Sequence, residues 1–365
     1  MQTALAAEPE VRRILAAPAG RGLVGEGDTL IQPDLAGVLA NIRVSGPIDF
    51  YTGTLADSFA ADVRKAGGST TARDLADYLP HWLQPLAISY DDKRAYFAPP
   101  PPAGGVIAGE MWAMLAKDDA YVDATETERD ALVVTTAERA FADRRQWPED
   151  IADPQSLVSS AHVEALMAET RGATTSAAAT SRPPATENPA AASFIAIDVE
   201  GGAVACTVTL NSLFGTGRVA AGTGIVLASL PGQGGRGASM LTPMLVVKPS
   251  GRQFVFAGAA AGGVTAPTAL VDVAARTLLA HEPVAAALAA PRMHGGSDPG
   301  YVFIEPGVSP QSVQALVNQG DTAVSVDRHL GEVNAIACPD GILSAPERCV
   351  AATDPRGLGL AASTE

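Results

Sequence analysis

Residues 191–218 read AASFIAIDVEGGAVACTVTLNSLFGTGR, and this stretch decides the fold. Its two runs SFIAID and GAVACTVTL have the alternating pattern of β-strands, and the EGG at 200–202 between them predicts a hairpin turn. The preceding residues 172–192 are small and polar with several prolines, which predicts an exposed, mobile connector. We therefore expect the main internal boundary of the chain just before this hairpin.

Regular patterns continue on both sides of the hairpin. Alternation of apolar and polar residues predicts further strands at 86–90, 95–98, 244–248 and 253–258. Apolar residues at three- and four-residue spacing predict a helix pair within 25–67 and helices at 106–116, 126–145, 162–169 and 267–280. Strands joined by hairpins and followed by helices favour an α+β fold with largely antiparallel sheets.

The composition excludes several classes of protein. With 365 residues, 47% of them apolar, the chain has ample material for a core. Its net charge of −15 and the lack of any Lys/Arg cluster argue against nucleic acid as a partner. No apolar run of about 18 residues is present to cross a membrane, and the opening MQTALAAEPEVRRIL lacks the apolar centre of a signal peptide. The sequence therefore leaves the compartment unknown.

The chain has three cysteines, Cys206, Cys338 and Cys349, without a CxxC pair or a Cys/His cluster at metal-ligand spacing. We therefore predict no metal and no cofactor. Cys338 and Cys349 flank the turn-rich segment PDGILSAPER. They could form a disulfide across a hairpin in an oxidising compartment, but the pattern favours two reduced thiols in the core.

Several segments, in a fixed order, resemble a known family. FYTGTLAD, TTARDLADY, PPPPAGG and AERAFADR are similar to the later half of the large subunit of the γ-glutamyltransferases, also called glutathione hydrolases. GGAVACTVTLNSLFGTGR, LTPMLVVK, GAAAGG, APR and DPRG are similar to the small subunit of that family. The resemblance covers nearly the whole sequence.

The resemblance implies the αββα four-layer sandwich of the N-terminal-nucleophile hydrolases, with part of the large-subunit half missing. It divides the chain into a large-subunit-like region at 1–171, a flexible linker at 172–190 before the self-cleavage junction, and a small-subunit-like region at 191–365. The implied substrate is a γ-glutamyl compound or another small amide. Members of the family are usually periplasmic or secreted.

In the family a threonine at the start of the small subunit cleaves the precursor and then attacks the substrate, with its own α-amino group as general base. The family's Thr-Thr-His-Phe-Ser opening falls on residues 191–195, so the nucleophile position is Ala191. An alanine has no hydroxyl, which predicts an uncut and inactive chain. The threonine that steadies the nucleophile matches Thr209, and the residue that holds the glutamyl end matches Asn211.

Other family positions are kept in part. The resemblance places the oxyanion hole at the N–H groups of Gly262 and Gly263, which are donors that cannot titrate. The family's paired substrate-binding serines align with Ser239 and Met240, so one hydroxyl is replaced by a thioether. The family's Gln-x-x-Asp should follow the GIVL strand, where the sequence reads ASLPG, and its carboxylate-binding arginine belongs to the missing half.

Three explanations of Ala191 remain open: a natural loss of activity, a deliberate Thr→Ala change that traps the precursor, or a takeover by another hydroxyl, of which Ser193 is nearest. A hypothesis from a different class is a non-catalytic binding or assembly module. A second chain or a homo-oligomer would then cover the missing half.

The remaining polar residues point to packing. Asp354 and Arg356 are interpreted as a structural ion pair or turn. The histidines are interpreted as surface or packing residues because no acid and hydroxyl lie at triad spacing: His81, His162, His281, His294 and His329.

Overall fold

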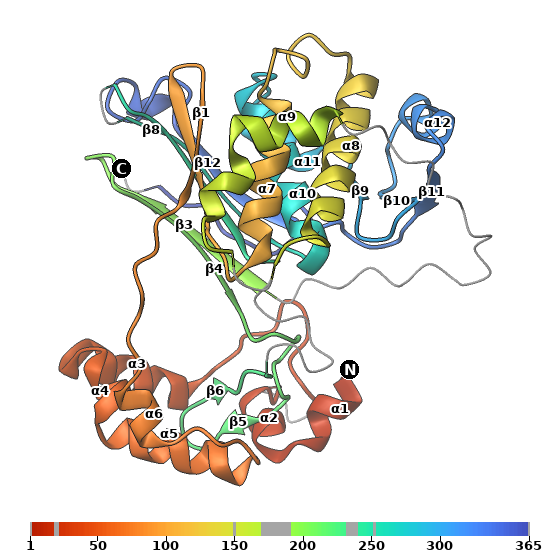
Figure 1. The fold of residues 1–365 in the computed structure, drawn as a ribbon. Helices are drawn as coiled ribbons and strands as arrows, with labels where there is room; N and C mark the ends of the chain where they lie inside the picture. Colours follow the sequence, from red (N-terminus) through yellow and green to blue (C-terminus); the bar gives the residue numbers. More distant parts are fainter. Residues whose placement is uncertain are drawn as a thin grey trace. The chain divides into compact units, whose positions relative to one another are not determined.

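The structure is a computed structural model that describes residues 2–17, 22–148, 151–168, 191–230, 240–250 and 253–363. The chain forms two compact units: unit 1 comprises residues 1–82 and 210–236, and unit 2 comprises residues 83–209 and 237–365 (Figure 1). The predicted connector lies outside the described residues, except that Ala191 and Ala192 already belong to a strand. The division at 171 and 190, which follows the two subunits of the family, stays a prediction.

Unit 1 is a set of short helices with one small strand pair. The predicted break within 25–67 is confirmed at Gly46, whose φ of 81° favours glycine, but the second predicted helix is divided into two at Gly53. Val11, Ile14 and Val219 form a small apolar cluster. The elements of unit 1 are α1 (Gln2–Ala7), α2 (Pro9–Ile14), α3 (Pro33–Ser45), α4 (Ile48–Thr52), α5 (Thr54–Lys65), α6 (Ala72–Ala76), β5 (Val219–Ala220) and β6 (Ile225–Val226).

Unit 2 is built on a six-stranded sheet with the order β1-β2-β7-β8-β12-β13, in which every neighbouring pair is antiparallel. The predicted antiparallel hairpins are thus confirmed. The strands are β1 (Leu86–Tyr90), β2 (Lys93–Phe97), β7 (Thr242–Lys248), β8 (Gln253–Ala261), β12 (Glu332–Ala337) and β13 (Val350–Ala352).

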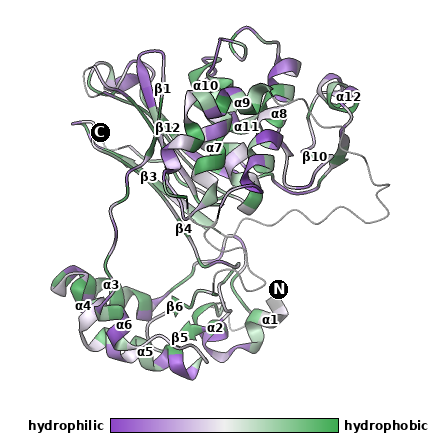
Figure 2. Ribbon diagram, in the orientation of Figure 1, coloured by the Kyte–Doolittle hydropathy of each residue, from purple (hydrophilic) through white to green (hydrophobic). Residues whose placement is uncertain are grey.

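One face of this sheet is covered by helices. Val333, Ala335 and Ala337 of β12 join the main core with the helices, whereas the alternate residue Ile336 belongs to a second cluster on the other face. Figure 2 shows that α7 is mostly apolar, whereas α8 has both apolar and polar residues. A Cβ at Gly105 would lie 2.0 Å from the carbonyl oxygen of Ala98, so glycine allows α7 to approach the sheet. The helices on this side are α7 (Ala103–Leu115), α8 (Glu126–Arg144), α9 (Ser160–Ala168), α10 (Ala266–Leu278) and α11 (Val284–Ala289).

The predicted hairpin packs on the opposite face of the sheet. It consists of β3 (Ala191–Ile197) and β4 (Ala203–Thr209), so the first strand begins two residues earlier than its sequence pattern indicates. Ile195 and Ile197 pack against the cluster that contains Phe254 and Ile336. The described part of unit 2 thus stacks helices, a large sheet and a hairpin.

A smaller sheet lies beside α8, with β10 (Tyr301–Ile304) between β11 (Thr322–Ser325), which is parallel to it, and β9 (Met293–Gly295), which is antiparallel. Helix α12 (Pro310–Asn318) connects β10 to β11 and packs on α8. No helix in the described ranges is long and apolar enough to cross a membrane.

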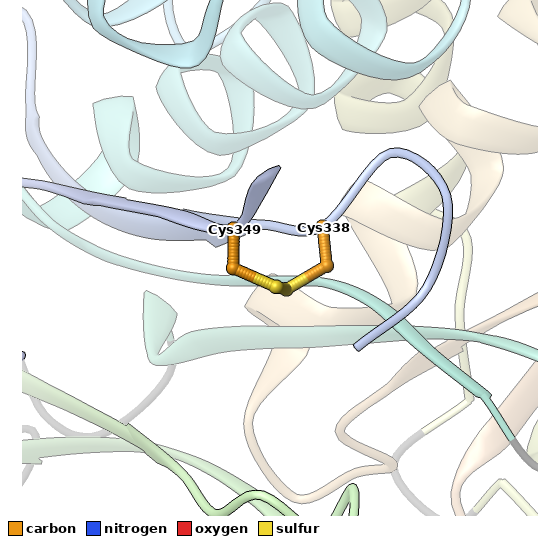
Figure 3. The surroundings of a disulfide bond; sticks show 2 residues. All are labelled: Cys338 and Cys349. Carbon is orange, nitrogen blue, oxygen red and sulfur yellow. A yellow bond between two sulfur atoms is a disulfide. The ribbon is translucent and has the colours of Figure 1, made fainter. Parts of the chain in front are cut away.

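Cys338 and Cys349 form a disulfide, so the favoured prediction of two reduced thiols is wrong (Figure 3). The register of β12 and β13 explains the bond. Ala337 lies opposite Val350, which places the next residue of one strand opposite the preceding residue of the other, with the two Cα atoms 4.2 Å apart. This pairing depends on tertiary structure and cannot be read from the cysteine spacing.

Replacing both Cys338 and Cys349 by alanine should lower the free energy of unfolding by about 3 kcal/mol, because the bond closes a short loop in the unfolded chain. Urea unfolding under non-reducing conditions measures this change. The matched control is Cys206→Ala, which removes the free thiol on β4 and should leave stability within about 1 kcal/mol of the parent. An equal loss of stability in the Cys338/Cys349 double variant and in Cys206→Ala would contradict the disulfide.

Candidate active site

The β3–β4 hairpin brings the predicted nucleophile position and its companion together. Ala191 pairs with Thr209, and Ser193 pairs with Thr207, in one antiparallel register. Side chains at alternate positions of β3 face the large sheet, and Ala191 and Ser193 are both half-buried on that face. The position opposite Thr209 therefore carries a methyl group and no hydroxyl.

A contact with β12 fixes the direction of the hairpin on the sheet. The side-chain amide of Asn334 donates to Ser193 Oγ at 2.8 Å and to its carbonyl oxygen at 3.3 Å. Farther along β3, Ile195 and Ile197 pack against the cluster of Ile336. Strand β3 therefore runs in the same direction as β12.

This direction places Ala191 at one particular end of the sheet. Ala191 precedes Ser193 by two residues, so it lies toward Glu332, the first residue of β12. Glu332 pairs with Ala261, the last residue of β8. The Gly262-Gly263 turn follows Ala261 at once, so the predicted nucleophile position and the predicted oxyanion turn lie at the same end of the sheet.

The glycine turn has a shape that other residues would strain. Gly262 has φ 146° and Gly263 has φ 61°. The carbonyl oxygen of Gly262 accepts hydrogen bonds from the N–H of Thr265 at 3.3 Å and from its hydroxyl at 3.0 Å. A Cβ on Gly262 would lie 2.7 Å from the Cα of Gly331, so the turn rests directly on the segment before β12.

A buried ionic network holds that segment. Arg292 donates to the carbonyl oxygen of Gly331 at 2.6 Å and pairs with Asp354 at 2.6 Å. Asp354 also accepts from the N–H of Val333 at 2.9 Å. Both ionic side chains are almost fully buried, so their mutual pairing offsets the loss of hydration.

A second pair completes the network. Arg356 donates to Glu305 through both Nε and Nη2 and lies 3.2 Å from Asp354, which confirms the structural ion pair predicted for Asp354 and Arg356. The N–H of Leu330 donates to Glu305 at 2.7 Å. Burial acts to raise the pKa of Glu305, but the hydrogen bonds from Arg356 and Leu330 outweigh it and lower the pKa. Glu305 is thus a fixed anion beneath the turn.

Glu332, the first residue of β12, is an acid at the end of the sheet toward which Ala191 lies. It is half-buried, and its burial together with the negative charge of Asp354 raises its pKa. Its partner across the sheet, Ala261, leads into the glycine turn. This end of the sheet therefore combines a half-buried carboxyl group with the backbone of the turn.

The other predicted substrate residues are placed differently. Asn211 belongs to unit 1, where it is buried with φ 64° and its side-chain amide donates to the carbonyl oxygen of Ser229 at 2.7 Å. Ser239 lies outside the described residues. Met240 is buried in the main core, and its carbonyl oxygen accepts from Thr242. Their roles in substrate binding stay predictions.

Sequence patterns gave no role to Asn334, Arg292 or Glu305. A polar residue at an inward position of the apolar run EVNAIA was the available signal for Asn334. Arg292 lies in the family-like segment APR, but its partners are far away in the sequence.

The profile of the Gamma-glutamyltranspeptidase family matches residues 1–230 and 228–364. The chain belongs to this family. The glutathione hydrolase proenzyme of Escherichia coli K12 is 29% identical over an alignment of 365 positions. The alignment covers 91% of the chain and 61% of the relative. That of Pseudomonas aeruginosa is 27% identical, covering 93% of the chain and 65% of the relative.

The family member described here thus spans less than two thirds of the length of these relatives. Among solved structures, a cephalosporin acylase from Bacillus halodurans has the same fold, with a TM-score of 0.77 and 24% identity. The match covers 97% of the chain and 66% of the acylase.

Removing one partner of the buried network should be costly. Arg292→Ala removes the partner of Asp354 Oδ2 and leaves Asp354 buried with only the longer 3.2 Å contact to Arg356, so it should lower the free energy of unfolding by about 3 kcal/mol, measured by urea unfolding. The matched control is Arg348→Ala, which breaks an exposed pair with Asp340 and should cost less than about 1 kcal/mol. Similar losses in both variants would show that the network does not stabilise this end of the sheet.

Proposed function

We propose that this chain derives from an enzyme that hydrolyses or transfers γ-glutamyl amides, as glutathione hydrolases do, and that it is itself uncut and inactive. The observation that carries the proposal is the methyl group of Ala191 at the start of β3, in register with Thr209. The relatives are proenzymes by name, and the family resemblance implies that the precursor cuts itself before it can work. Without a hydroxyl at this position neither step has a nucleophile.

The surrounding geometry supports the parent chemistry. A threonine at residue 191 would attack the amide carbonyl carbon, its oxygen would form an ester with the glutamyl group, and the amine would leave with a proton. Water or a second amine would then take the acyl group. The N–H groups of Gly262 and Gly263 would stabilise the oxyanion, and Thr209 would steady the nucleophile. The roles of Asn211, Ser239 and Met240 in substrate binding are what the family resemblance implies.

The complete αββα sandwich is part of the same proposal. The described residues of unit 2 supply the helical layer, the large sheet and the hairpin. A fourth, helical layer would cover the outer face of the hairpin, where Phe194 and Val204 are 60% and 61% exposed. Exposed apolar side chains on paired strands support such a cover.

Restoring the hydroxyl tests the proposal. Ala191→Thr should produce two fragments that part between residues 190 and 191, and hydrolysis of a γ-glutamyl anilide should rise on the order of 10⁴-fold or more. Intact-mass spectrometry and release of the coloured aniline from the anilide are the measurements. The matched control is Ala192→Thr, whose side chain faces away from the sheet and should restore nothing. An Ala191→Thr chain that stays whole would show that more than one residue separates this fold from catalysis.

An amidase that uses Ser193 is the first alternative. Its support is the Asn334 amide, which holds the Ser193 hydroxyl at 2.8 Å on the face that Ala191 shares. This route requires cleavage between Ala192 and Ser193.

We expect a single uncut species in the intact-mass spectrum of the purified chain. Ser193 lies two residues inside the hairpin, and cleavage before it would remove the pairs that Ala191 and Ala192 make with β4. Fragments that part between residues 192 and 193 would overturn both the uncut state and the inactive function.

A non-catalytic binding or assembly module is the second alternative, and the exposed face of Phe194, Val204 and Val208 favours it. A second chain or a second copy would cover this face. Size-exclusion chromatography with light scattering decides the matter for copies of this chain and for partners that co-purify with it. A well-behaved, stable monomer would contradict a required partner.

A further inference from the structure

Three side chains from three helices meet on the helical side of the large sheet. Glu110 comes from α7, Asp143 from α8 and His162 from α9, and Figure 1 shows these helices side by side. His162 Nε2 lies 3.1 Å from Asp143 Oδ2 and 3.8 Å from Glu110 Oε1. One ligand atom from each residue lies within 4.8 Å of the others. The residues are too far apart in sequence to form a recognisable motif.

Glu110 is the member of the cluster that packing leaves unexplained. Its residue is 0% exposed, and neither carboxylate oxygen has a hydrogen-bond partner among the described residues. Burying a carboxyl group without partners is costly, so an unpartnered one aimed at two further ligand groups needs a reason. A cation bound between Glu110 and Asp143 would compensate for the burial of the two acids.

The spacing of the three groups suits a small metal ion. Zinc lies about 2.0–2.2 Å from nitrogen and oxygen ligands, and tetrahedral angles then separate two ligand atoms by about 3.4 Å. The distances of 3.1 Å and 3.8 Å from His162 fall on either side of this value. The indole N–H of Trp147 donates to Asp143 Oδ2 at 2.7 Å, as outer hydrogen bonds orient carboxylate ligands in metal sites.

We propose that Glu110, Asp143 and His162 bind one divalent transition-metal ion of the zinc class. An imidazole ligand with two carboxylates favours zinc over magnesium or calcium, which prefer all-oxygen sites. His162 keeps 26% of its side chain exposed, so water can supply the fourth ligand. The ion would join α7, α8 and α9 on the face of the sheet opposite the β3–β4 hairpin, so its role is separate from the glutamyl chemistry.

Zinc titration of the whole purified chain, freed of metal by a chelator and then freed of the chelator, tests the site. Isothermal titration calorimetry should show one zinc ion per chain, and zinc should raise the melting temperature whereas magnesium at the same concentration should not. Cobalt should bind in place of zinc and give the visible absorption of a four-coordinate site. No zinc binding, or no change in melting temperature, would overturn the proposal in favour of a proton shared by the two acids.

Variants separate this site from adventitious binding. His162→Ala should weaken zinc binding by about 100-fold or more, and Trp147→Phe, which removes only the supporting hydrogen bond, by about 10-fold. The matched controls are His81→Ala, an exposed histidine of unit 1, and Glu164→Gln, an exposed acid of α9 that pairs with Lys117. Both should bind zinc as the parent does. Unchanged affinity in His162→Ala would overturn the assignment even if the parent binds zinc.

Discussion

The ion pair between Arg292 and Asp354 is the constraint on which this end of the sheet depends. It is buried on both sides, and its groups also bond to the backbone at Gly331 and Val333, so the start of β12 cannot move independently of the C-terminal segment. Gly331 supports Gly262 through close backbone contact. A buried pair of this kind needs further hydrogen bonds, and here the carbonyl oxygens of Gly331 and Leu288 accept from Arg292 while the N–H of Val333 donates to Asp354. The buried pair of Arg292 and Asp354 therefore fixes the position of Gly331, and Gly331 in turn supports the glycine turn.

The two-residue period of a strand sets a second constraint. Moving the nucleophile from residue 191 to residue 193 keeps the side chain on the same face but shifts it along the strand by about 6–7 Å. That shift is about twice the length of a hydrogen bond. The same two N–H groups of the glycine turn therefore cannot serve hydroxyls at both positions. A Ser193 enzyme would need a second oxyanion site, and the side chain beside Ser193 is the amide of Asn334.

Local patterns predicted the local part of the fold. Alternation and the EGG turn identified the β3–β4 hairpin, because both depend on neighbouring residues, and the family-like segments associated residue 191 with Thr209, its partner in the hairpin register. The disulfide was only the less favoured alternative because it depends on the register of β12 with β13. The cluster of Glu110, Asp143 and His162 was missed because helix packing alone brings it together. Tertiary contacts, which one sequence does not display, account for both failures.

Residues that the fold requires must be distinguished from residues that only the reaction requires before the preserved features are used as evidence of activity. Gly262 is required by its contact with Gly331 whether or not an oxyanion ever forms, and Arg356 with Glu305 holds the segment before β12 in either case. These residues would be retained in an inactive protein because losing them would damage the fold. The side chain at residue 191 has no such structural duty, since a methyl group and a threonine both fit a half-buried strand position. The proposal of an uncut, inactive chain therefore rests on residue 191, where the side chain reports chemistry and not packing, and does not rest on the intact surroundings.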